Sequence, residues 1–412
     1  MKTLIVIIYI ILLSSCQHNL ASFSTDLYAP LSNPPLIKNN IFLGGFSGLV
    51  FIKNPTPNTL DFYGITDRGP NGDGFKYAST VNGQLKKYFA RTFLLPDFQP
   101  RIVKLKIQDN ATTFTQEILL KNPDGSKMTG LPNRENGDDE FPMDYNNKKM
   151  SYDLNGIDSE SLAIDQNGNF WIGEEYGPSL LKFNNEGKLI KRFAPEDSYQ
   201  PKDIKFLNEK YGAKFFITNL PKIYKKRMIN RGFEAMTIFN NKIYAMTQSS
   251  LTTKNNDTGL STFIRILEFD IASETVIGEY AYTLDNSLHK LGDLCVGSDG
   301  TFYLIEQDGN LGNKSFRSIF KFRLDGATNF LTLKIESNLE ELDSETILKI
   351  ITPVKKELAL NLTQKGFHYV EKLEGLTLID EHTFATINDN DFGVENSEIS
   401  NQIKSIIGIF HF

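Results

Sequence analysis

The sequence predicts an all-β fold of the β-propeller type, in which four-stranded sheets, called blades, surround a central channel. Three observations support this. One hairpin pattern recurs along the chain, further strands follow most of its copies, and the last residues, 406–412 (IIGIFHF), form a strand that could pair with an N-terminal strand near 37–42 and close a ring. Repeated four-stranded units are typical of propellers. The pattern shows five blades and leaves room for a sixth, whereas a two-sheet sandwich would not explain the repeat.

The hairpin copies share an opening acid, a short apolar strand, a polar turn and a second strand rich in aromatic or branched residues. Asn-Gly and Asp-Gly turns in two copies favour tight hairpins. Four copies open at Glu160, Glu234, Asp293 and Glu374, and a looser one opens at Ser47. Further strands are expected at 101–107, 113–120, 179–193, 263–271, 275–284 and 319–324.

Three insertions precede the first strands of later blades, and we expect them to cover one face of the ring. They span residues 121–159, 195–233 and 335–373, and the last should hold a helix near 351–362. Long loops on one face of a rigid scaffold usually form the binding site.

The N-terminus resembles a bacterial lipoprotein signal. The apolar run 4–13 would span only about 15 Å as a helix, half of a hydrocarbon core. Leu13-Ser14-Ser15-Cys16 is similar to a lipobox, with a lipid on the Cys16 thiol. We therefore expect a signal peptide at 1–15, a lipidated tether at 16–40 and the propeller at 41–412. Gln17 after the cysteine favours the outer membrane of the cell envelope; the alternative is an ordinary signal peptide.

Composition excludes several classes of protein. The net charge is −6, with 44 basic and 50 acidic residues, which argues against a nucleic-acid partner. Two cysteines exclude a disulfide scaffold and a multi-cysteine zinc site. Glycine-rich phosphate loops, G-x-S-x-G and H-E-x-x-H are absent from the sequence. Neither membrane contact beyond the lipid nor an oligomeric state is indicated.

A second polar residue lies fourteen positions after each opening acid. The pairs are Glu160 with Glu174, Glu234 with Gln248, Asp293 with Gln307, and Glu374 with Asn388; in the looser copy Asp67 follows Ser47. The start of the first strand and the end of the second lie at the same end of an antiparallel hairpin. All these residues should therefore gather at one mouth of the channel.

Carboxylates gathered there predict a cation. At ~8 Å and an effective dielectric near 20, each pair would repel by about 2 kcal/mol, so protons or a metal must compensate. Oxygen ligands without His or Cys favour Ca²⁺ over zinc. The expected ligands are Glu160, Glu234, Asp293, Glu374 and Asp67, with Gln248, Gln307 and Asn388 as substrate contacts. The alternative is that the acids accept backbone N–H groups of the loops.

Four further side chains are candidates for catalysis. Glu174 or Glu175 would serve as general base, and Arg68 or Arg231 would stabilise a developing anion. The alternative for each arginine is a buried pairing with a carboxylate of the ring.

Several motifs resemble the bacterial "esterase-like activity of phytase" family, the phytase-like propeller domain. They are TDRGPNGDG (66–74), GIDSESLAIDQNGNFWIGEEYGP (156–178), NRGFEAMTI (230–238), LGDL (291–294) and KLEGLTL (372–378). The resemblance covers roughly residues 40–412 and implies hydrolysis of phosphate or carboxylic esters. Relatives by fold, the calcium-dependent propeller phytases and lactonases, hold calcium in the channel. This chain departs from calcium phytases because it lacks a dense Lys/Arg cluster in sequence.

The sequence therefore predicts an envelope-anchored, calcium-dependent hydrolase whose substrate is a small phosphate or carboxylic ester. The alternative hypothesis is a non-catalytic propeller that binds a ligand or protein partner through its loop face.

Overall fold

The computed structural model describes residues 26–38, 40–53, 59–81, 84–133, 140–252, 261–335, 338–370, 372–394 and 404–412. The predicted signal peptide and Cys16 lie outside these ranges. No helix in the described ranges has the length and apolar character needed to cross a membrane.

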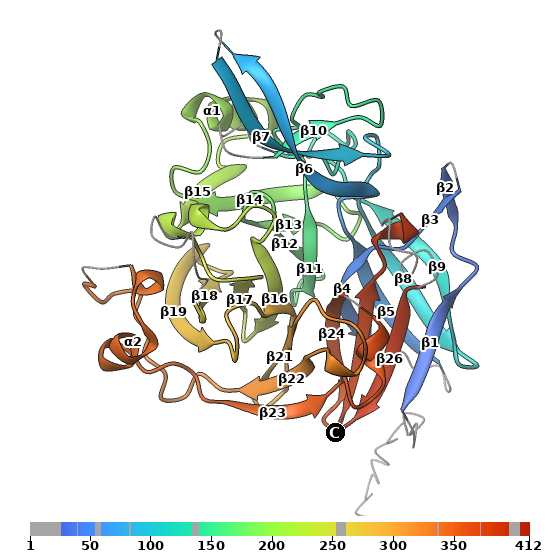
Figure 1. Ribbon diagram of the computed structural model, residues 1–412, viewed down its shortest axis with the longest axis vertical. Coiled ribbons are helices and arrows are strands. Elements are labelled where there is room, and N and C mark those ends of the chain that lie inside the picture. The colour runs from blue at the N-terminus through green and yellow to red at the C-terminus, as the bar shows by residue number, and fades with distance from the viewer. Residues whose placement is uncertain are drawn as a thin grey trace, which may run out of the picture.

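Five blades surround a central axis (Figure 1). Blades two, three and four are separate sheets of four or five strands, whereas blades one and five are joined in one eight-stranded sheet. Blade one contains β4 (Phe46–Ile52), β5 (Leu60–Thr66), β8 (Arg101–Gln108) and β9 (Ala111–Leu119). Blade two contains β11 (Ser159–Ile164), β12 (Phe170–Glu174), β13 (Ser179–Phe183), β14 (Leu189–Pro195) and an added parallel strand, β15 (Phe216–Leu220). Blade three contains β16 (Phe233–Phe239), β17 (Lys242–Thr247), β18 (Phe263–Asp270) and β19 (Thr275–Thr283). Blade four contains β20 (Lys290–Val296), β21 (Phe302–Gln307), β22 (Arg317–Phe322) and β23 (Lys356–Asn361). Blade five contains β24 (Lys372–Asp380), β25 (Thr383–Asp389), β26 (Ile406–His411) and β1 (Leu27–Ser32).

The innermost strands form a closed ring. Strands β4, β11, β16, β20 and β24 contact one another in that order, and β24 contacts β4 again. The propeller predicted from the hairpin repeat is therefore confirmed, and the ring of inner strands closes after five within the described residues.

The N-terminal strand closes the ring at its outer edge. Strand β1 pairs antiparallel with β26 and then runs parallel to β9 of blade one, which ties the last blade to the first. The predicted partner near 37–42 instead forms a short pair, β2 (Leu36–Lys38) and β3 (Ile41–Phe42). Residues 27–32, expected in the tether, belong to the propeller because every second side chain of β1 is buried.

Insertions add structure around the ring, and one of them, residues 67–100 between β5 and β8, was not among the three expected from the sequence. Strands β6 (Asn71–Val81), β7 (Gln84–Phe93) and β10 (Phe141–Met143) form a separate sheet that projects from the ring in Figure 1. The insertion helices are α1 (Pro201–Tyr211) and α2 (Ser344–Ile350). Short 3₁₀ turns lie at η1 (Lys222–Lys226), η2 (Gly312–Lys314), η3 (Leu339–Glu341), η4 (Phe367–Tyr369) and η5 (Asp391–Gly393). The helix predicted near 351–362 is wrong: Asp343 caps the earlier helix α2, and Lys356–Asn361 pairs with β22 instead.

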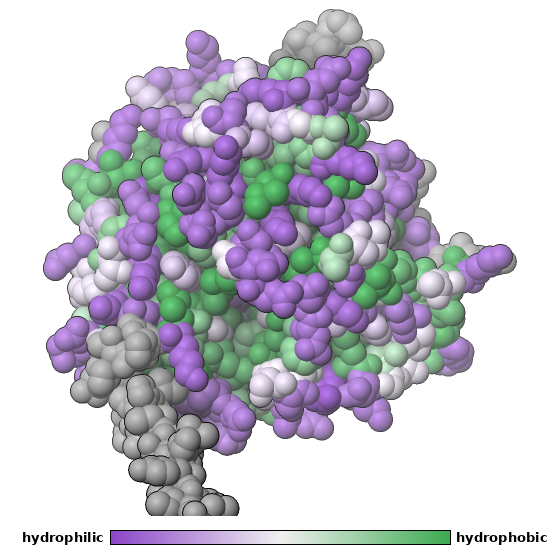
Figure 2. Space-filling model, turned by 180° about the vertical axis from the view of Figure 1, so that it is seen from behind, coloured by the Kyte–Doolittle hydropathy of each residue, from purple (hydrophilic) through white to green (hydrophobic). Residues whose placement is uncertain are grey.

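The apolar core lies between neighbouring blades. Between blades two and three, for example, Trp171 stacks on Phe193 and contacts Phe269, and its indole N–H donates to Asp165 at 3.1 Å. At the hairpin-turn end of the channel, residues of all five inner strands line a cavity of about 190 Å³. Seen from behind the view of Figure 1, green side chains gather in a hollow near the middle of the molecule (Figure 2).

Each inner strand carries a β-bulge near its first residue. The register shifts at Ser47, Glu160, Glu234 and Glu374, and at Gly292–Asp293 in blade four. Bulges re-aim a side chain and commonly stand near functional sites. The repeated acids therefore occupy bulge positions in three blades, whereas the matching position of blade four holds Gly292.

The position after each bulge residue is small because the axis is crowded. Gly48, Ser161, Ala235 and Gly375 stand there. A Cβ atom on Gly48 would lie 2.9 Å from the backbone nitrogen of Leu162, and one on Gly375 would lie 2.9 Å from the Leu49 Cβ. Blade four alone has a larger residue at this position, Asp293.

Asp293 fills the axis and binds the inner strands together. Its carboxylate accepts the N–H of Leu294 at 2.8 Å and that of Leu376 at 3.0 Å. Burial raises the pKa of Asp293, and hydrogen bonds from the backbone of these two residues, Leu49 and Met236 oppose the rise. Four blades thus share one acceptor. Asp293 departs from its predicted role as a metal ligand because its oxygens are engaged by the backbone, which was the alternative left open.

We expect Asp293→Ala to lower the free energy of unfolding by about 3 kcal/mol or more, because it leaves several buried N–H groups without an acceptor at ~1–3 kcal/mol each. Urea unfolding would measure the loss. Asp325→Ala is the control: Asp325 is 78% exposed and pairs only with Arg323 on the surface, so the change should be within about 1 kcal/mol. Equal losses in the two variants would show that Asp293 does not hold the blades together.

Candidate metal centre

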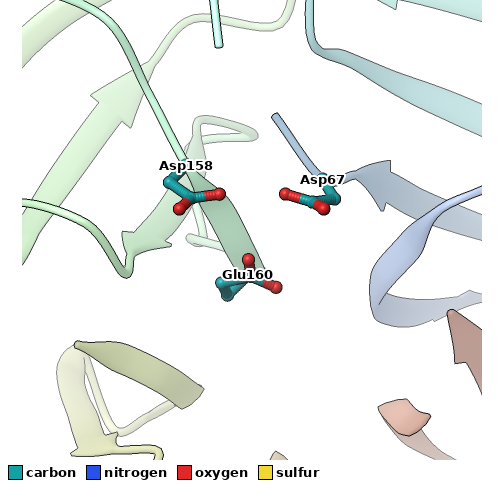
Figure 3. Close-up of side chains that lie close together, drawn as sticks. All are labelled: Asp67, Asp158 and Glu160. Atoms are coloured by element: carbon teal, nitrogen blue, oxygen red, sulfur yellow. The ribbon is translucent and has the colours of Figure 1, made fainter. Parts of the chain in front are cut away.

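Three groups of carboxylates lie at the mouth where the inner strands begin. Within each group, one ligand oxygen from every residue lies within 4.8 Å of the others. The groups are Asp67, Asp158 and Glu160; Glu160, Glu234 and Glu374; and Asp67, Asp389 and Asp391. Figure 3 shows the first group, with the carboxylates of Asp67 and Asp158 turned toward one another above Glu160. Glu160 and Asp67 each belong to two groups, so the three form one continuous cluster.

Four blades supply this cluster. Asp67 directly follows β5, Asp158 precedes β11, and Glu160, Glu234 and Glu374 stand at the bulges of β11, β16 and β24. The backbone fixes the loop residues: the N–H of Asp67 donates to the Gly45 carbonyl at 2.7 Å, and the N–H of Glu175 donates to the Asp158 carbonyl at 2.9 Å. The sequence prediction of one mouth lined by repeated acids therefore agrees with the geometry for Glu160, Glu234, Glu374 and Asp67.

Several of these oxygens are buried without a hydrogen-bond donor. Glu234 is 1% exposed, and both of its carboxylate oxygens lack a hydrogen-bond partner. The same holds for Oε1 of Glu175 and for both oxygens of Asp158, one of which lies 3.3 Å from Arg68. Buried polar atoms are normally satisfied, so such a group marks a place where a proton or an ion belongs.

Burial and mutual repulsion raise the pKa values of the cluster. Burial, followed by neighbouring carboxylates, raises the pKa of Asp67, Glu160 and Glu234 well above the usual range. Burial raises the pKa of Asp158 and of Glu374 to about 7, although Arg68 and Lys372 respectively act against this rise. Burial raises the pKa of Glu175 to about 8, with Arg68 opposing it and Glu374 reinforcing it.

The two candidate arginines differ in their surroundings. Arg68 is buried, and its Nη1 contacts Glu140 at 3.0 Å and Asp158 at 3.3 Å. Arg91 holds the other oxygen of Glu140 at 2.8 Å. Arg68 therefore pairs with buried carboxylates, which was the alternative that the sequence analysis gave for each arginine. Arg231 is half-buried, and its side chain makes no hydrogen bond or ion pair with the described residues.

Arg231 belongs to a cationic rim that the sequence did not predict. Burial, followed by the nearby charges of Arg231 and Lys372, lowers the pKa of Lys290, while Glu374 and Glu175 oppose the shift. Lys372 also pairs with Asp389 at 3.4 Å and with Asp391. Three cations thus lie beside the buried carboxylates, and all three are half-buried. A positively charged rim over an acidic floor suits an anionic ligand bound to a cation.

Four residues of the predicted second ring take different roles. Glu174 accepts the N–H of Gly177 at 2.9 Å and the Ser179 hydroxyl at 3.2 Å. Gln307 exchanges two hydrogen bonds of 3.0 Å with the backbone of Leu373. Asn388 accepts the N–H of Ile406 at 2.7 Å. These three amide and carboxylate groups hold the backbone and are not presented to a substrate. Gln248 differs, because its amide lies beside Glu234 and lowers that residue's pKa, although the two side chains do not reach hydrogen-bond geometry.

The sequence analysis missed Asp158, Asp389, Asp391, Lys290 and Lys372. Asp158 and Lys372 lie within the motifs 156–178 and 372–378 already singled out, and Asp389 directly follows the candidate Asn388. Lys290 and Lys372 stand one residue before the apolar residue that precedes each bulge. That shared spacing, Lys-Leu-Gly-Asp and Lys-Leu-Glu-Gly, was a signal for the rim.

The residues present fit a hard cation. All donors are carboxylate oxygens, as Ca²⁺ prefers, and unpartnered oxygens converge within one cluster. The described histidines and Cys295 stand outside the three groups, which disfavours zinc.

Part of this chain is similar in sequence to a known protein. A protein of Arthroderma benhamiae called an uncharacterized secreted protein is 29% identical over 284 residues, which is 59% of this chain. The chain covers 52% of that relative's length.

Similar solved structures are distant. The α-L-arabinofuranosidase PaAbf62A of Podospora anserina has a TM-score of 0.37 at 10% identity, covering 94% of this chain and 98% of that one. A virginiamycin B lyase of Staphylococcus aureus has a TM-score of 0.34 at 10% identity, covering 94% and 99%. The fold assignment therefore stands on the strand topology. The family described as "Phytase-like: Esterase-like activity of phytase" matches residues 41–392, and the chain belongs to it.

Proposed function

We propose that this protein is a metal-dependent hydrolase of phosphate or carboxylic esters, with Ca²⁺ as the metal. The family membership and the cluster geometry support this proposal. The observation that carries it is Glu234, whose two buried oxygens lack a donor between Glu160 and Glu374. A fold with no use for a cation would be expected to satisfy them with backbone N–H groups, as it does at Asp293.

The cluster assigns separate tasks to its residues. Glu160, Glu234 and Glu374 would hold the ion, which when bound polarises an ester and acidifies a water molecule. Glu175 is the better candidate for general base: its pKa of about 8 suits proton transfer near neutral pH, and its Oε1 is unpartnered. Glu174, the other predicted base, is held by Gly177 and Ser179.

The cationic rim favours a negatively charged substrate. Arg231 and Lys290 form no ion pair with the described residues, so both can bind a phosphate or carboxylate oxygen. Arg68 is held between Glu140 and Asp158 and would position Asp158 and not contact the substrate. We therefore favour phosphate esters, whose charge persists in both substrate and product, over neutral carboxylic esters.

A non-catalytic binding protein is the second candidate. The observation that favours it is burial: Glu160, Glu234 and Glu374 are 6%, 1% and 8% exposed. A substrate would reach the metal only past the half-buried Asp67 and the rim. If a substrate cannot reach the metal, the same centre would stabilise the fold, and the loop face would bind a ligand.

We also propose a location outside the cytoplasm. The relative from Arthroderma benhamiae is named as a secreted protein, which supports export. Lipidation at Cys16 and anchoring in the outer membrane stay predictions from the lipobox.

Calcium should raise the melting temperature by several degrees relative to EGTA, because an ion that binds only the native state stabilises it by mass action. Glu234→Gln should abolish this rise and also abolish calcium-dependent hydrolysis of p-nitrophenyl phosphate. Glu381→Gln makes the same change on an exposed turn of blade five and should alter neither. Magnesium is the control cation. Full calcium response and full turnover in Glu234→Gln would overturn the assignment of the site.

In chelator, stability should fall as pH rises from 5.5 to 8.5. Asp158 and Glu374 have a pKa of about 7 and Glu175 of about 8 in the folded protein, above their unfolded values, so the folded state binds protons more tightly. The stabilisation that these bound protons provide is complete below the pKa of each carboxyl in the unfolded chain. It is lost as the pH rises past the pKa of that carboxyl in the folded protein.

Thermal melts across this pH range would test the expectation. Calcium should reduce the loss at high pH, and Glu175→Gln should flatten the profile because its amide does not titrate. A melting temperature that rises with pH in chelator would contradict the assignment of raised pKa values to these carboxylates.

A further inference from the structure

Glu160 belongs to two separate carboxylate groups. In one group its ligand oxygen lies within 4.8 Å of those of Asp67 and Asp158, and in the other within 4.8 Å of those of Glu234 and Glu374. Figure 3 shows Glu160 facing the gap between Asp67 and Asp158. A carboxylate has two oxygens, so one side chain can ligate two cations.

Each group contains its own buried, unpartnered oxygens. In the group with Glu374, both oxygens of Glu234 lack a hydrogen-bond donor. In the group with Asp67, the Asp158 carboxylate is 2% exposed and lies beside Arg68 and Asp67, and its Oδ1 accepts no hydrogen bond from a donor among the described residues. These are independent side chains from different blades, and each belongs to a different group.

The charges around the cluster also indicate two cations. Eight carboxylates gather there: Asp67, Asp158, Glu160, Glu175, Glu234, Glu374, Asp389 and Asp391. Four cations face them: Arg68, Arg231, Lys290 and Lys372. With every group ionised, four negative charges remain, which two divalent cations would neutralise.

The third group already has a cation. Lys372 contacts Asp389 at 3.4 Å and also Asp391, so its ammonium neutralises the group that these residues form with Asp67. In the first group Arg68 lies 3.3 Å from Asp158, but the same guanidinium nitrogen also contacts Glu140 at 3.0 Å. Glu160, Glu234 and Glu374 form no ion pair with the residues that the structure describes. The expected number of metal ions is therefore two and not three.

We propose that the centre binds two hard divalent cations, one between Asp67, Asp158 and Glu160 and one between Glu160, Glu234 and Glu374, with Glu160 as their shared ligand. This inference rests on the proposed metal-dependent function and specifies its cofactor. Two adjacent cations can hold both the attacking and the leaving oxygen of a phosphoryl group in line. The rim formed by Arg231, Lys290 and Lys372 would then contact the remaining phosphate oxygens.

Binding stoichiometry tests the proposal directly. The full chain is stripped with chelator and titrated with Ca²⁺ by calorimetry and equilibrium dialysis. We expect two ions per chain for the native sequence and for the control Glu381→Gln. Glu234→Gln and Asp158→Asn should each retain one ion, and Glu160→Gln should weaken both sites at least tenfold.

Manganese provides a second measurement that does not depend on activity. Two Mn²⁺ ions bridged by one carboxylate should give a spin-coupled paramagnetic resonance spectrum, and Glu234→Gln or Asp158→Asn should give the six-line spectrum of an isolated ion. If Asp158→Asn fails to fold because Arg68 loses its partner, Asp67→Asn removes a ligand of the same group.

The outcomes separate this inference from the proposed function. One ion per native chain, with uncoupled manganese, would overturn the two-cation centre and leave a single-metal hydrolase intact. No ion at all would overturn both. Two ions that both persist in Glu160→Gln would overturn the shared ligand.

Discussion

The rest of the structure depends on the hydrogen bonds between one buried carboxylate and the backbone of the inner strands. A propeller leaves polar N–H groups directed at its axis wherever the inner strands bulge, and these groups need an acceptor. Asp293 supplies one for the strands of several blades. Below it, the channel is lined by apolar residues of all five inner strands. Above it, the channel opens at the acidic mouth. One side chain thereby links the inner strands of several blades at the axis.

The same bulges explain why the acids converge. A regular strand would turn Glu160, Glu234 and Glu374 into the spaces between blades, which are filled by apolar side chains. The extra residue of each bulge releases the acid from this alternation and aims it at the mouth. The small residue that follows lets the strands approach the axis. Fold and site therefore arise from one local irregularity, repeated in successive blades.

The repeat made the propeller and most of the acidic mouth predictable, because both follow from a fixed spacing along the chain. Two features could not be predicted from the repeat. In blade four the pattern is displaced by one residue, so Asp293 faces the axis and Gly292 takes the place of the acid. Asp391, Lys290 and Lys372 reach the cluster from outside the hairpin pattern, so only the folded ring brings them together. The N-terminal strand was missed because Pro30 and the polar residues around it resemble a tether, while its partner is nearly 380 residues away in the chain.

The contrast between satisfied and unsatisfied polar groups identifies the functional part of the mouth. Glu174, Gln307 and Asn388 stand at equivalent ends of second strands, and each forms hydrogen bonds with groups of the chain itself. Glu234, Glu175 and Asp158 are equally buried, yet they keep oxygens without donors. The fold provides hydrogen-bond donors for buried side chains such as Glu174 that have a structural role. A group of buried carboxylates without donors therefore indicates that their partner comes from outside the chain. A hard cation is the partner whose charge and ligand preference match an all-oxygen cluster with excess negative charge.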